Sequence, residues 1–206
     1  MKLTDYDAII FDLGGVVINL DYENTSKVFK SLGLDDFETL YSQAEQTGLF
    51  DSFEKGACSI PYFINKLLTY LPSGITPNQV VHAWNAMILD FPIKNLEFLS
   101  QLRESKATYL LSNTNEIHIA KVHQKLNEVV DKKTIHSYFK KVYFSSEMGM
   151  RKPTKEIFDF VINEQQLIPS RTLFIDDTLQ HIEGAEKAGL KTHHLQRDEK
   201  IYTIFS

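Results

Sequence analysis

The sequence predicts an α/β protein whose core is a Rossmann-like parallel sheet, with a small all-helical segment inserted into it. Five short β-rich apolar runs occur along the chain. Helical patterns separate most of these runs, and such alternation is typical of a parallel sheet. By contrast, the interval from residue 20 to residue 93 holds several amphipathic stretches and no convincing strand.

The apolar runs expected to form the strands are short and rich in branched and aromatic side chains. They cover residues 8–11, 108–111, 142–144, 173–175 and 190–193. Two helices between them have readable boundaries, because proline favours the first helical position and glycine the position just after the last. We therefore expect one helix to begin at Pro153 and another to end before Gly189, both packed on the sheet.

The inserted segment has a helical pattern of its own. Pro61 and Pro77 stand at plausible helix starts, and Pro92 marks the return to the sheet. We therefore expect a core domain formed by residues 1–19 and 94–206 and a helical cap formed by residues 20–93. Its amphipathic stretches lie around residues 28–32, 37–41, 62–71 and 80–89.

Composition and charge exclude several classes of partner. The 206 residues are 43% hydrophobic and 24% charged, which is close to the globular average. With 22 basic and 27 acidic residues the formal charge is −5, so no basic excess faces a phosphate backbone or anionic lipid. No apolar run approaches the length of a membrane helix. We expect a cytoplasmic protein that acts on a small phosphorylated molecule, without nucleic-acid or membrane partners, and in an oligomeric state that the sequence leaves open, a monomer included.

Polar residues follow three of the predicted strands at the point where each strand ends. Asp12 follows the first run, Ser112 and Asn113 follow the second, and Asp176 and Asp177 follow the fourth. In open parallel sheets, ligands bind outside the carboxyl ends of the strands. These five residues are therefore candidates for one site.

Three carboxylates at neighbouring strand ends would repel one another. Each close pair costs on the order of 4 kcal/mol at 4 Å and an effective dielectric of 20. A hard cation would relieve this repulsion, and oxygen ligands without a Cys or His at ligand spacing favour Mg²⁺ over zinc. Water and phosphate would fill the remaining positions, so the inferred site handles a phosphate group.

The candidate residues suit phosphoryl transfer. Asp12 can attack phosphorus, and Ser112 with the backbone amides after it can hold the transferring oxygens. Lys152, which follows the third run, can offset their growing negative charge. A covalent aspartyl phosphate is the predicted intermediate.

Four segments resemble, in order, the four motifs of the haloacid dehalogenase-like (HAD) hydrolase superfamily, and the resemblance spans nearly the whole chain. The segments are residues 11–16 (FDLGGV), 111–114 (LSNT), 152–153 (KP) and 174–177 (FIDD). The resemblance implies that Asp12 is both the nucleophile and a Mg²⁺ ligand. It also implies that the Gly14 carbonyl binds Mg²⁺, that Asp177 is the main metal carboxylate, and that Asp176 is a second ligand.

The same resemblance gives roles to the remaining motifs. It makes Ser112 and Asn113 the phosphate-holding pair, Lys152 the neutralising charge, and the helical insert a cap that excludes water and selects substrates. Residues 53–56 resemble the family's loop that dips toward the substrate. Tyr22 and Trp84 are candidates for the entrance, with simple cap packing as the equal alternative.

The sequence departs from the family pattern at Gly14. Most phosphatases of the family carry an aspartate there, which protonates the leaving oxygen and later activates water. Loss of such help typically lowers the rate by about 10² to 10⁴, so alkyl phosphates should react slowly. This variant resembles the branch with bacterial α-glucose-1-phosphate phosphatase and the N-terminal domain of soluble epoxide hydrolases. An anomeric phosphate leaves more easily, so a sugar phosphate such as glucose 1-phosphate is the predicted substrate.

Two other functions stay open. A 2-haloacid dehalogenase also attacks through the first aspartate and also lacks the second acid. Such an enzyme works without Mg²⁺, however, so the Asp176–Asp177 pair argues against a dehalogenase. A catalytically weak domain that binds a phosphorylated ligand is the second alternative. The retained Asp12, Lys152 and Asp177 favour catalysis.

Overall fold

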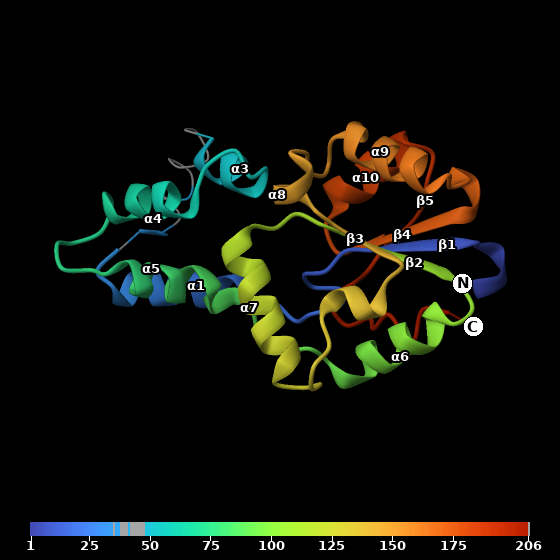
Figure 1. Cartoon of the computed structure of the whole chain (residues 1–206), viewed down its shortest axis with the longest axis horizontal. Helices are drawn as coiled ribbons and strands as arrows, with labels where there is room; N and C mark the ends of the chain where they lie inside the picture. Colours follow the sequence, from blue (N-terminus) through green and yellow to red (C-terminus); the bar gives the residue numbers. More distant parts are fainter. Residues whose placement is uncertain (35, 38–40, 42–47, 206) are drawn as a thin grey trace.

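A five-stranded parallel sheet forms the centre of the chain in the computed structural model (Figure 1), which describes residues 1–34, 36, 37, 41 and 48–205. The strand order is β3-β2-β1-β4-β5, as expected for the predicted fold class. Every predicted run matches a strand to within one residue at each end. The strands are β1 (Ala8–Phe11), β2 (Ala107–Ser112), β3 (Lys141–Phe144), β4 (Thr172–Asp176) and β5 (Lys191–His194).

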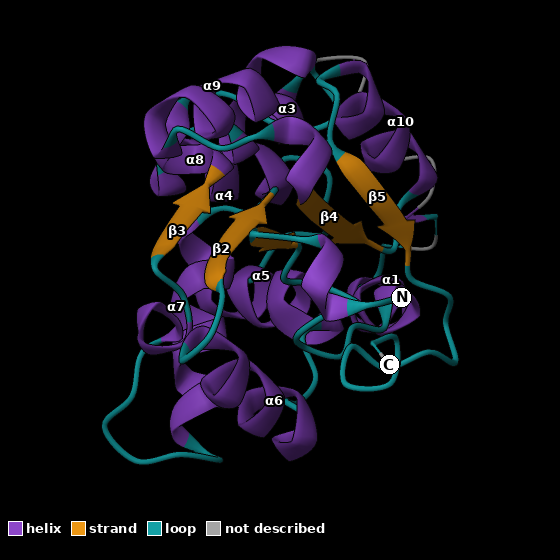
Figure 2. Cartoon of the chain, turned by 90° about the vertical axis from the view of Figure 1, so that its right-hand side faces the viewer, coloured by secondary structure: helices purple, strands orange, loops and turns teal. Residues whose placement is uncertain are grey.

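Helices cover both faces of the sheet (Figure 2). Successive strand side chains point to opposite faces, so Ile9 and Phe11 join one apolar cluster and Ala8 and Ile10 join another. The first cluster includes side chains of α6 (Ile93–Arg103) and α7 (Glu116–Asn127), and the second includes side chains of α9 (Lys155–Gln165) and α10 (Leu179–Lys187). Because both faces are covered, the three central strands β1, β2 and β4 are largely apolar rather than alternating, whereas the edge strand β5 is polar.

A separate group of helices lies away from the sheet, on the left of Figure 1. Between β1 and α6 the described residues contain no strand. The four helices described in this segment pack around an apolar cluster in which Phe63 and Val80 are fully buried. Pro61 and Pro77 stand in their first turns, as predicted. The helices are α1 (Tyr22–Ser31), α3 (Leu49–Glu54), α4 (Ile60–Leu68) and α5 (Pro77–Trp84).

The two segments that connect these helices to the sheet run side by side. The backbone N–H of Asn19 donates to Asp90, and the N–H of Leu89 donates to Asn19. The division into residues 1–19 and 94–206 on one side and 20–93 on the other stays a prediction. Within the predicted helical stretch at 37–41, residues 38–40 lie outside the described part of the chain.

One helix boundary was predicted correctly and one was not. Gly189 follows α10 and its C-cap with a φ of +85°, where glycine is favoured. Pro153, however, does not begin a helix, because α9 begins at Lys155 after the N-cap Thr154. The side chain of Asn113 binds both backbone polar groups of Lys152 and holds this segment as a loop between α8 (Ser145–Met148) and α9.

The chain termini lie close together, at the end of the molecule far from the cap helices (Figure 1). The N-terminal ammonium donates to the carbonyl of Ile204 at 2.9 Å. Every helix within the described residues is too short or too polar to span a bilayer. Four short 3₁₀ segments complete the described structure: η1 (Leu3–Asp5), η2 (Asn85–Met87), η3 (Ile135–Tyr138) and η4 (Pro169–Arg171).

Candidate active site

Three carboxylates meet at the carboxyl edge of the sheet. Asp12 follows β1, Asp176 ends β4, and Asp177 comes next; β1 and β4 are neighbours. One oxygen of each carboxylate lies within 4.8 Å of the others. Asp12 and Asp176 are buried and Asp177 is half-buried. The structure therefore brings together the three acidic residues that the sequence singled out.

Lys152 lies between two of these carboxylates. Its Nζ is 2.7 Å from Oδ1 of Asp12 and 2.6 Å from Oδ2 of Asp176. Burial alone would lower the pKa of Lys152, but the two carboxylates outweigh it and raise the pKa above its usual value. Lys152 is thus held as a buried cation at the candidate nucleophile.

The carboxylates respond differently to the same environment. Burial raises the pKa of Asp12, and neighbouring Asp176 adds to this effect against the opposing charge of Lys152. Burial also acts on Asp176, yet Lys152 and His181 bring its pKa below the usual value. Burial and the charge of Asp176 raise the pKa of Asp177. A second positive charge beside Asp12 and Asp177 would favour their ionised forms.

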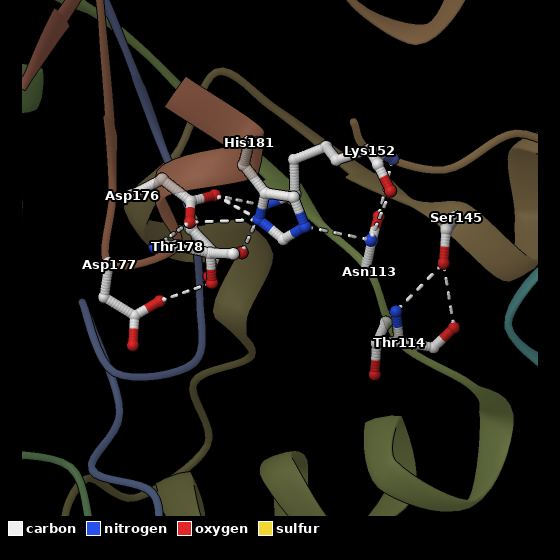
Figure 3. Close-up of polar contacts among 9 residues, drawn as sticks. Asn113, Thr114, Ser145, Lys152, Asp176, Asp177, Thr178 and His181 are labelled. Atoms are coloured by element: carbon white, nitrogen blue, oxygen red, sulfur yellow. Dashed lines mark hydrogen bonds and ion pairs between the residues drawn. The ribbon is translucent and has the colours of Figure 1, made fainter. Parts of the chain in front are cut away.

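A ring of hydrogen bonds joins Lys152, Asn113, His181 and Asp176 (Figure 3). The Asn113 amide group exchanges two 2.9 Å hydrogen bonds with the backbone of Lys152 and faces Nε2 of His181 at 3.5 Å. Nδ1 of His181 lies 3.0 Å from both oxygens of Asp176. The Asp176 carboxylate accepts from Nδ1–H in this arrangement, which leaves Nε2 as the acceptor from Asn113. The ring fixes the position of the lysine from both its backbone and its ammonium end.

Besides His181, two positioning residues escaped the sequence analysis. Buried Ser145, the first residue after β3, donates to the carbonyl of Thr114 at 3.0 Å and accepts from its N–H at 2.9 Å (Figure 3). The signal that identified Asp12, a polar residue at the end of a strand, applies equally to Ser145. Gly15 has a φ of +71°, and a Cβ there would lie 2.1 Å from Oδ2 of Asp177, so only glycine leaves room for this carboxylate.

A cavity of about 280 Å³ opens between these loops and the cap helices. Gly14, Ser112 and Asn113 line its sheet side, and Tyr22 and Trp84 line its cap side. Trp84 is buried, whereas Tyr22 is largely exposed. Both aromatic residues proposed for the entrance therefore face the same cavity as the predicted phosphate-holding pair.

The cap contacts the loop that carries Lys152. Nη1 of Arg151 lies 3.1 Å from Oε2 of Glu54 and 3.5 Å from Oδ1 of Asp51, both on α3. Gly56, just beyond α3, packs so closely on α8 that an added Cβ would lie 2.1 Å from the carbonyl oxygen of Ser146. Glu54 also lines the cavity. The predicted substrate loop at 53–56 is thus fixed to the core beside Lys152.

The acidic cluster suits a hard divalent cation. Among the described residues it offers three carboxylates and no sulfur or imidazole ligand, a donor set typical of Mg²⁺ rather than zinc. The close approach of Gly15 to Asp177 leaves this carboxylate next to the backbone of the loop after β1. Asp12, Asp176 and Asp177 are thus able to hold such an ion together.

Comparisons with known proteins agree with this geometry. The model of the haloacid dehalogenase-like hydrolase family matches residues 6–189. D-ribitol-5-phosphate phosphatase from Bacteroides thetaiotaomicron is 33% identical over 184 residues, which cover 89% of each chain. A sesquiterpene phosphatase from Aspergillus oryzae is 26% identical over 196 residues, covering 93% of this chain and 91% of that protein.

A solved structure has a similar fold. It is a wild-type HAD family enzyme from Bacteroides thetaiotaomicron in complex with magnesium and inorganic phosphate. That protein is 33% identical to this chain, with a TM-score of 0.89 over 98% of this chain and 100% of the other. The fold, the acidic cluster and these similarities lead to one conclusion: the chain belongs to the haloacid dehalogenase-like hydrolase family.

Proposed function

We propose that this protein is a Mg²⁺-dependent phosphomonoester hydrolase that acts through an aspartyl phosphate on a small phosphorylated metabolite. The observation that carries the proposal is the contact of Lys152 with Asp12 beside the acidic cluster. A nucleophile, a buried cation and metal-binding carboxylates are the groups that phosphoryl transfer requires. The phosphatase names of two relatives, and the magnesium and phosphate in a solved structure 33% identical to this chain, support it.

Each candidate residue has a role in this scheme. A carboxylate oxygen of Asp12 forms a bond to phosphorus as the bond to the leaving oxygen breaks. Ser112 and Asn113 hold the phosphoryl oxygens, and Lys152 neutralises part of their charge. A Mg²⁺ ion held by Asp12, Asp176, Asp177 and the Gly14 carbonyl would supply further positive charge at the phosphoryl group.

The substrate is proposed to be a sugar or polyol phosphate. The leaving-group argument at Gly14 favours an anomeric phosphate such as glucose 1-phosphate, because its departing oxygen is less basic. The name of the ribitol-phosphate relative instead supports the phosphate of an open-chain polyol. A cavity of about 280 Å³ suits a small leaving group in either case.

The alternatives receive less support. A dehalogenase needs the aspartate nucleophile but not a cluster of three carboxylates that suits Mg²⁺. A protein that only binds phosphorylated ligands needs no nucleophile in contact with a buried lysine. Metal dependence distinguishes a phosphatase from a dehalogenase. Turnover distinguishes a phosphatase from a protein that only binds phosphorylated ligands.

The test is phosphate release from glucose 1-phosphate, D-ribitol 5-phosphate, glucose 6-phosphate and p-nitrophenyl phosphate, with Mg²⁺ or with a chelator. Release that requires Mg²⁺ and disappears in Asp12→Asn is the expected result. A folded wild-type protein that releases phosphate from none of the four compounds would overturn the proposal. Faster turnover of glucose 6-phosphate than of glucose 1-phosphate would count against the anomeric substrate.

A further inference from the structure

Hydrolysis of an alkyl phosphate, such as the phosphate of an open-chain polyol, needs a proton donor. The leaving oxygen departs as a strongly basic alkoxide unless a nearby acid protonates it, and a positioned acid typically contributes about 10² to 10⁴ in rate. Gly14 has no side chain to supply this proton. The donor must therefore come from elsewhere around the cavity.

Few acids face the cavity. Its described lining includes one carboxyl group, Glu54, and one imidazole, His118, besides the phenols Tyr22 and Tyr41, which are weak acids. Nε2 of His118 lies 3.1 Å from the carbonyl of Trp84, and its Nδ1 lies 3.2 Å from the Asn115 amide, so both nitrogens are engaged. Burial lowers the pKa of His118 to about 4, which leaves the ring neutral at neutral pH.

Glu54 differs from His118 both in its hydrogen bonding and in the direction of its pKa shift. It is the last residue of α3, and it lines the cavity together with Gly14, Ser112 and Asn113. Its side chain is 25% exposed. Oε2 is buried and has no hydrogen-bond partner among the described groups, although Arg151 lies 3.1 Å away as an ion-pair partner. Glu54 therefore brings a carboxyl group to the cavity lining, and its Oε2 forms no hydrogen bond with the described groups.

The surroundings of Glu54 shift its pKa above the usual value. Burial raises the pKa of Glu54, and the opposing charges of Arg151 and Lys152 limit the effect, while Asp51 on the same helix adds to it. Tyr22 lines the same cavity from α1, and its phenol is neutral at neutral pH. A residue that first gives and then accepts a proton needs a balance of this kind.

We propose that Glu54, from the cap, is the general acid and base of this hydrolase, an inference that rests on the proposed function. As the bond from Asp12 to phosphorus forms and the bond to the leaving oxygen breaks, the Glu54 carboxyl gives its proton to that oxygen and an alcohol departs. Glu54, now a carboxylate, then takes a proton from the water that attacks phosphorus. Inorganic phosphate leaves, and Asp12 and protonated Glu54 are restored.

The test compares Glu54→Gln with wild type on two substrates. With D-ribitol 5-phosphate, whose leaving group needs a proton, kcat should fall about 10²- to 10⁴-fold. With p-nitrophenyl phosphate, whose leaving group departs without a proton, formation of the aspartyl phosphate should persist while its hydrolysis slows. The variant should then give a rapid burst of p-nitrophenolate, about one per active site, followed by slow turnover. A purely structural role for Glu54 would slow both substrates alike and give no new burst.

Matched variants separate the proton from the contact with Arg151. Asp51 also faces Arg151 but is not part of the cavity lining, so Asp51→Asn should leave turnover of both substrates close to wild type. Adding Gly14→Asp to Glu54→Gln should restore part of the lost rate, because it supplies a carboxyl group at position 14. The same variant needs Leu20→Ala to make room, since a Cβ at Gly14 would lie 2.5 Å from the end of the Leu20 side chain. If Glu54→Gln does not fold, Glu54→Asp takes its place in the test. Glu54→Asp keeps a carboxyl group, so it should turn over p-nitrophenyl phosphate without a burst.

The outcomes separate this inference from the proposed function. A wild-type protein without Mg²⁺-dependent release from any substrate refutes the hydrolase itself. A hydrolase in which Glu54→Gln keeps wild-type turnover of D-ribitol 5-phosphate, or in which Asp51→Asn reproduces the whole loss, refutes only the role of Glu54.

Discussion

The Nζ of Lys152 lies 2.6 Å from Oδ2 of Asp176, and neither side chain is exposed to solvent. The same ammonium lies 2.7 Å from Asp12, so one buried cation serves two carboxylates. Removing one partner of a buried ion pair leaves the other charge uncompensated, which typically costs about 3 to 5 kcal/mol. Lys152 therefore supports the fold as well as the chemistry.

Lys152→Met should lower the free energy of unfolding of chelator-treated protein by about 3 to 5 kcal/mol in urea denaturation. Added Mg²⁺ should reduce this loss, because the ion would face the same carboxylates. Lys155→Met is the control, since Lys155 pairs with Asp159 on the surface and such pairs contribute at most about 1 kcal/mol. Equal losses in the two variants would contradict the expectation.

Stability should depend on pH through His118, which joins α7 to the cap. Its ring stacks on Trp84 at 5.2 Å, and its Nε2–H donates to the Trp84 carbonyl. Burial lowers the pKa of His118 from 6.5 to about 4. The unfolded chain therefore takes up a proton first as the pH falls, so this stabilisation is present above pH 6.5 and is lost as the pH falls toward 4.

The loss should reach at most about 3.5 kcal/mol, since the pKa falls from 6.5 to about 4 and each pKa unit corresponds to about 1.4 kcal/mol. His118→Gln keeps a donor for the Trp84 carbonyl but does not titrate, so its unfolding free energy should fall less over the same pH range. Urea denaturation at several pH values gives the slope of unfolding free energy against pH for wild type and for His118→Gln, and the two slopes are compared. His82→Gln, on the exposed side of α5, is the control and should follow wild type.

The fold was largely predictable because its signals are local. The central strands β1, β2 and β4 are buried on both faces, so each appears in the sequence as a largely apolar run. The parallel arrangement then brings together the residues that follow these runs, which is why the amino-acid order alone predicts that Asp12, Ser112 and Asp176 share one site. The start of α9 was mispredicted because a side chain from a distant loop overrides the local preference of Pro153.

Other features of the site depend on contacts between distant segments. The Asn113–His181 contact spans 68 positions, and nothing near His181 in the sequence marks its approach to Asp176. The steric need for glycine at position 15 appears only when Asp177 is seen beside it. The contact of Glu54 with Arg151 likewise requires the cap to be placed on the core. These residues position or complement the motif residues, and tertiary packing alone brings them there.

Ser145→Ala should loosen the loop after β2. The substitution leaves the N–H and carbonyl of Thr114 without their side-chain partner, which should cost about 1 to 3 kcal/mol of unfolding free energy. Because this loop also carries Asn113, the inhibition constant of inorganic phosphate should rise. Ser146→Ala is a matched control, since the Ser146 hydroxyl is buried and has no hydrogen-bond partner among the described residues, so its loss should be neutral or stabilising. A loss confined to the Ser146 variant would refute the role of Ser145.

The contact between the cap loop and α8 can be tested with two glycines that share a backbone conformation. Gly56 has a φ of +65° and Gly48 a φ of +67°. Alanine at either position should cost about 1 to 2 kcal/mol of left-handed backbone strain. Only at Gly56 would the new Cβ meet another group, the Ser146 carbonyl oxygen at 2.1 Å, whereas none of the described residues lies within 4 Å at Gly48.

Gly56→Ala should therefore move the cap loop away from the core, and Gly48→Ala should not. Glu54 lies two residues before Gly56, so displacement of the loop should lower kcat/KM on the order of 10-fold to 10²-fold, as expected for misplacement by about 1 Å. Gly48→Ala should lower the melting temperature with little change in kcat/KM. Steady-state kinetics and thermal unfolding of both variants check this, and equal kinetic losses would mean that backbone strain, rather than contact with α8, controls activity.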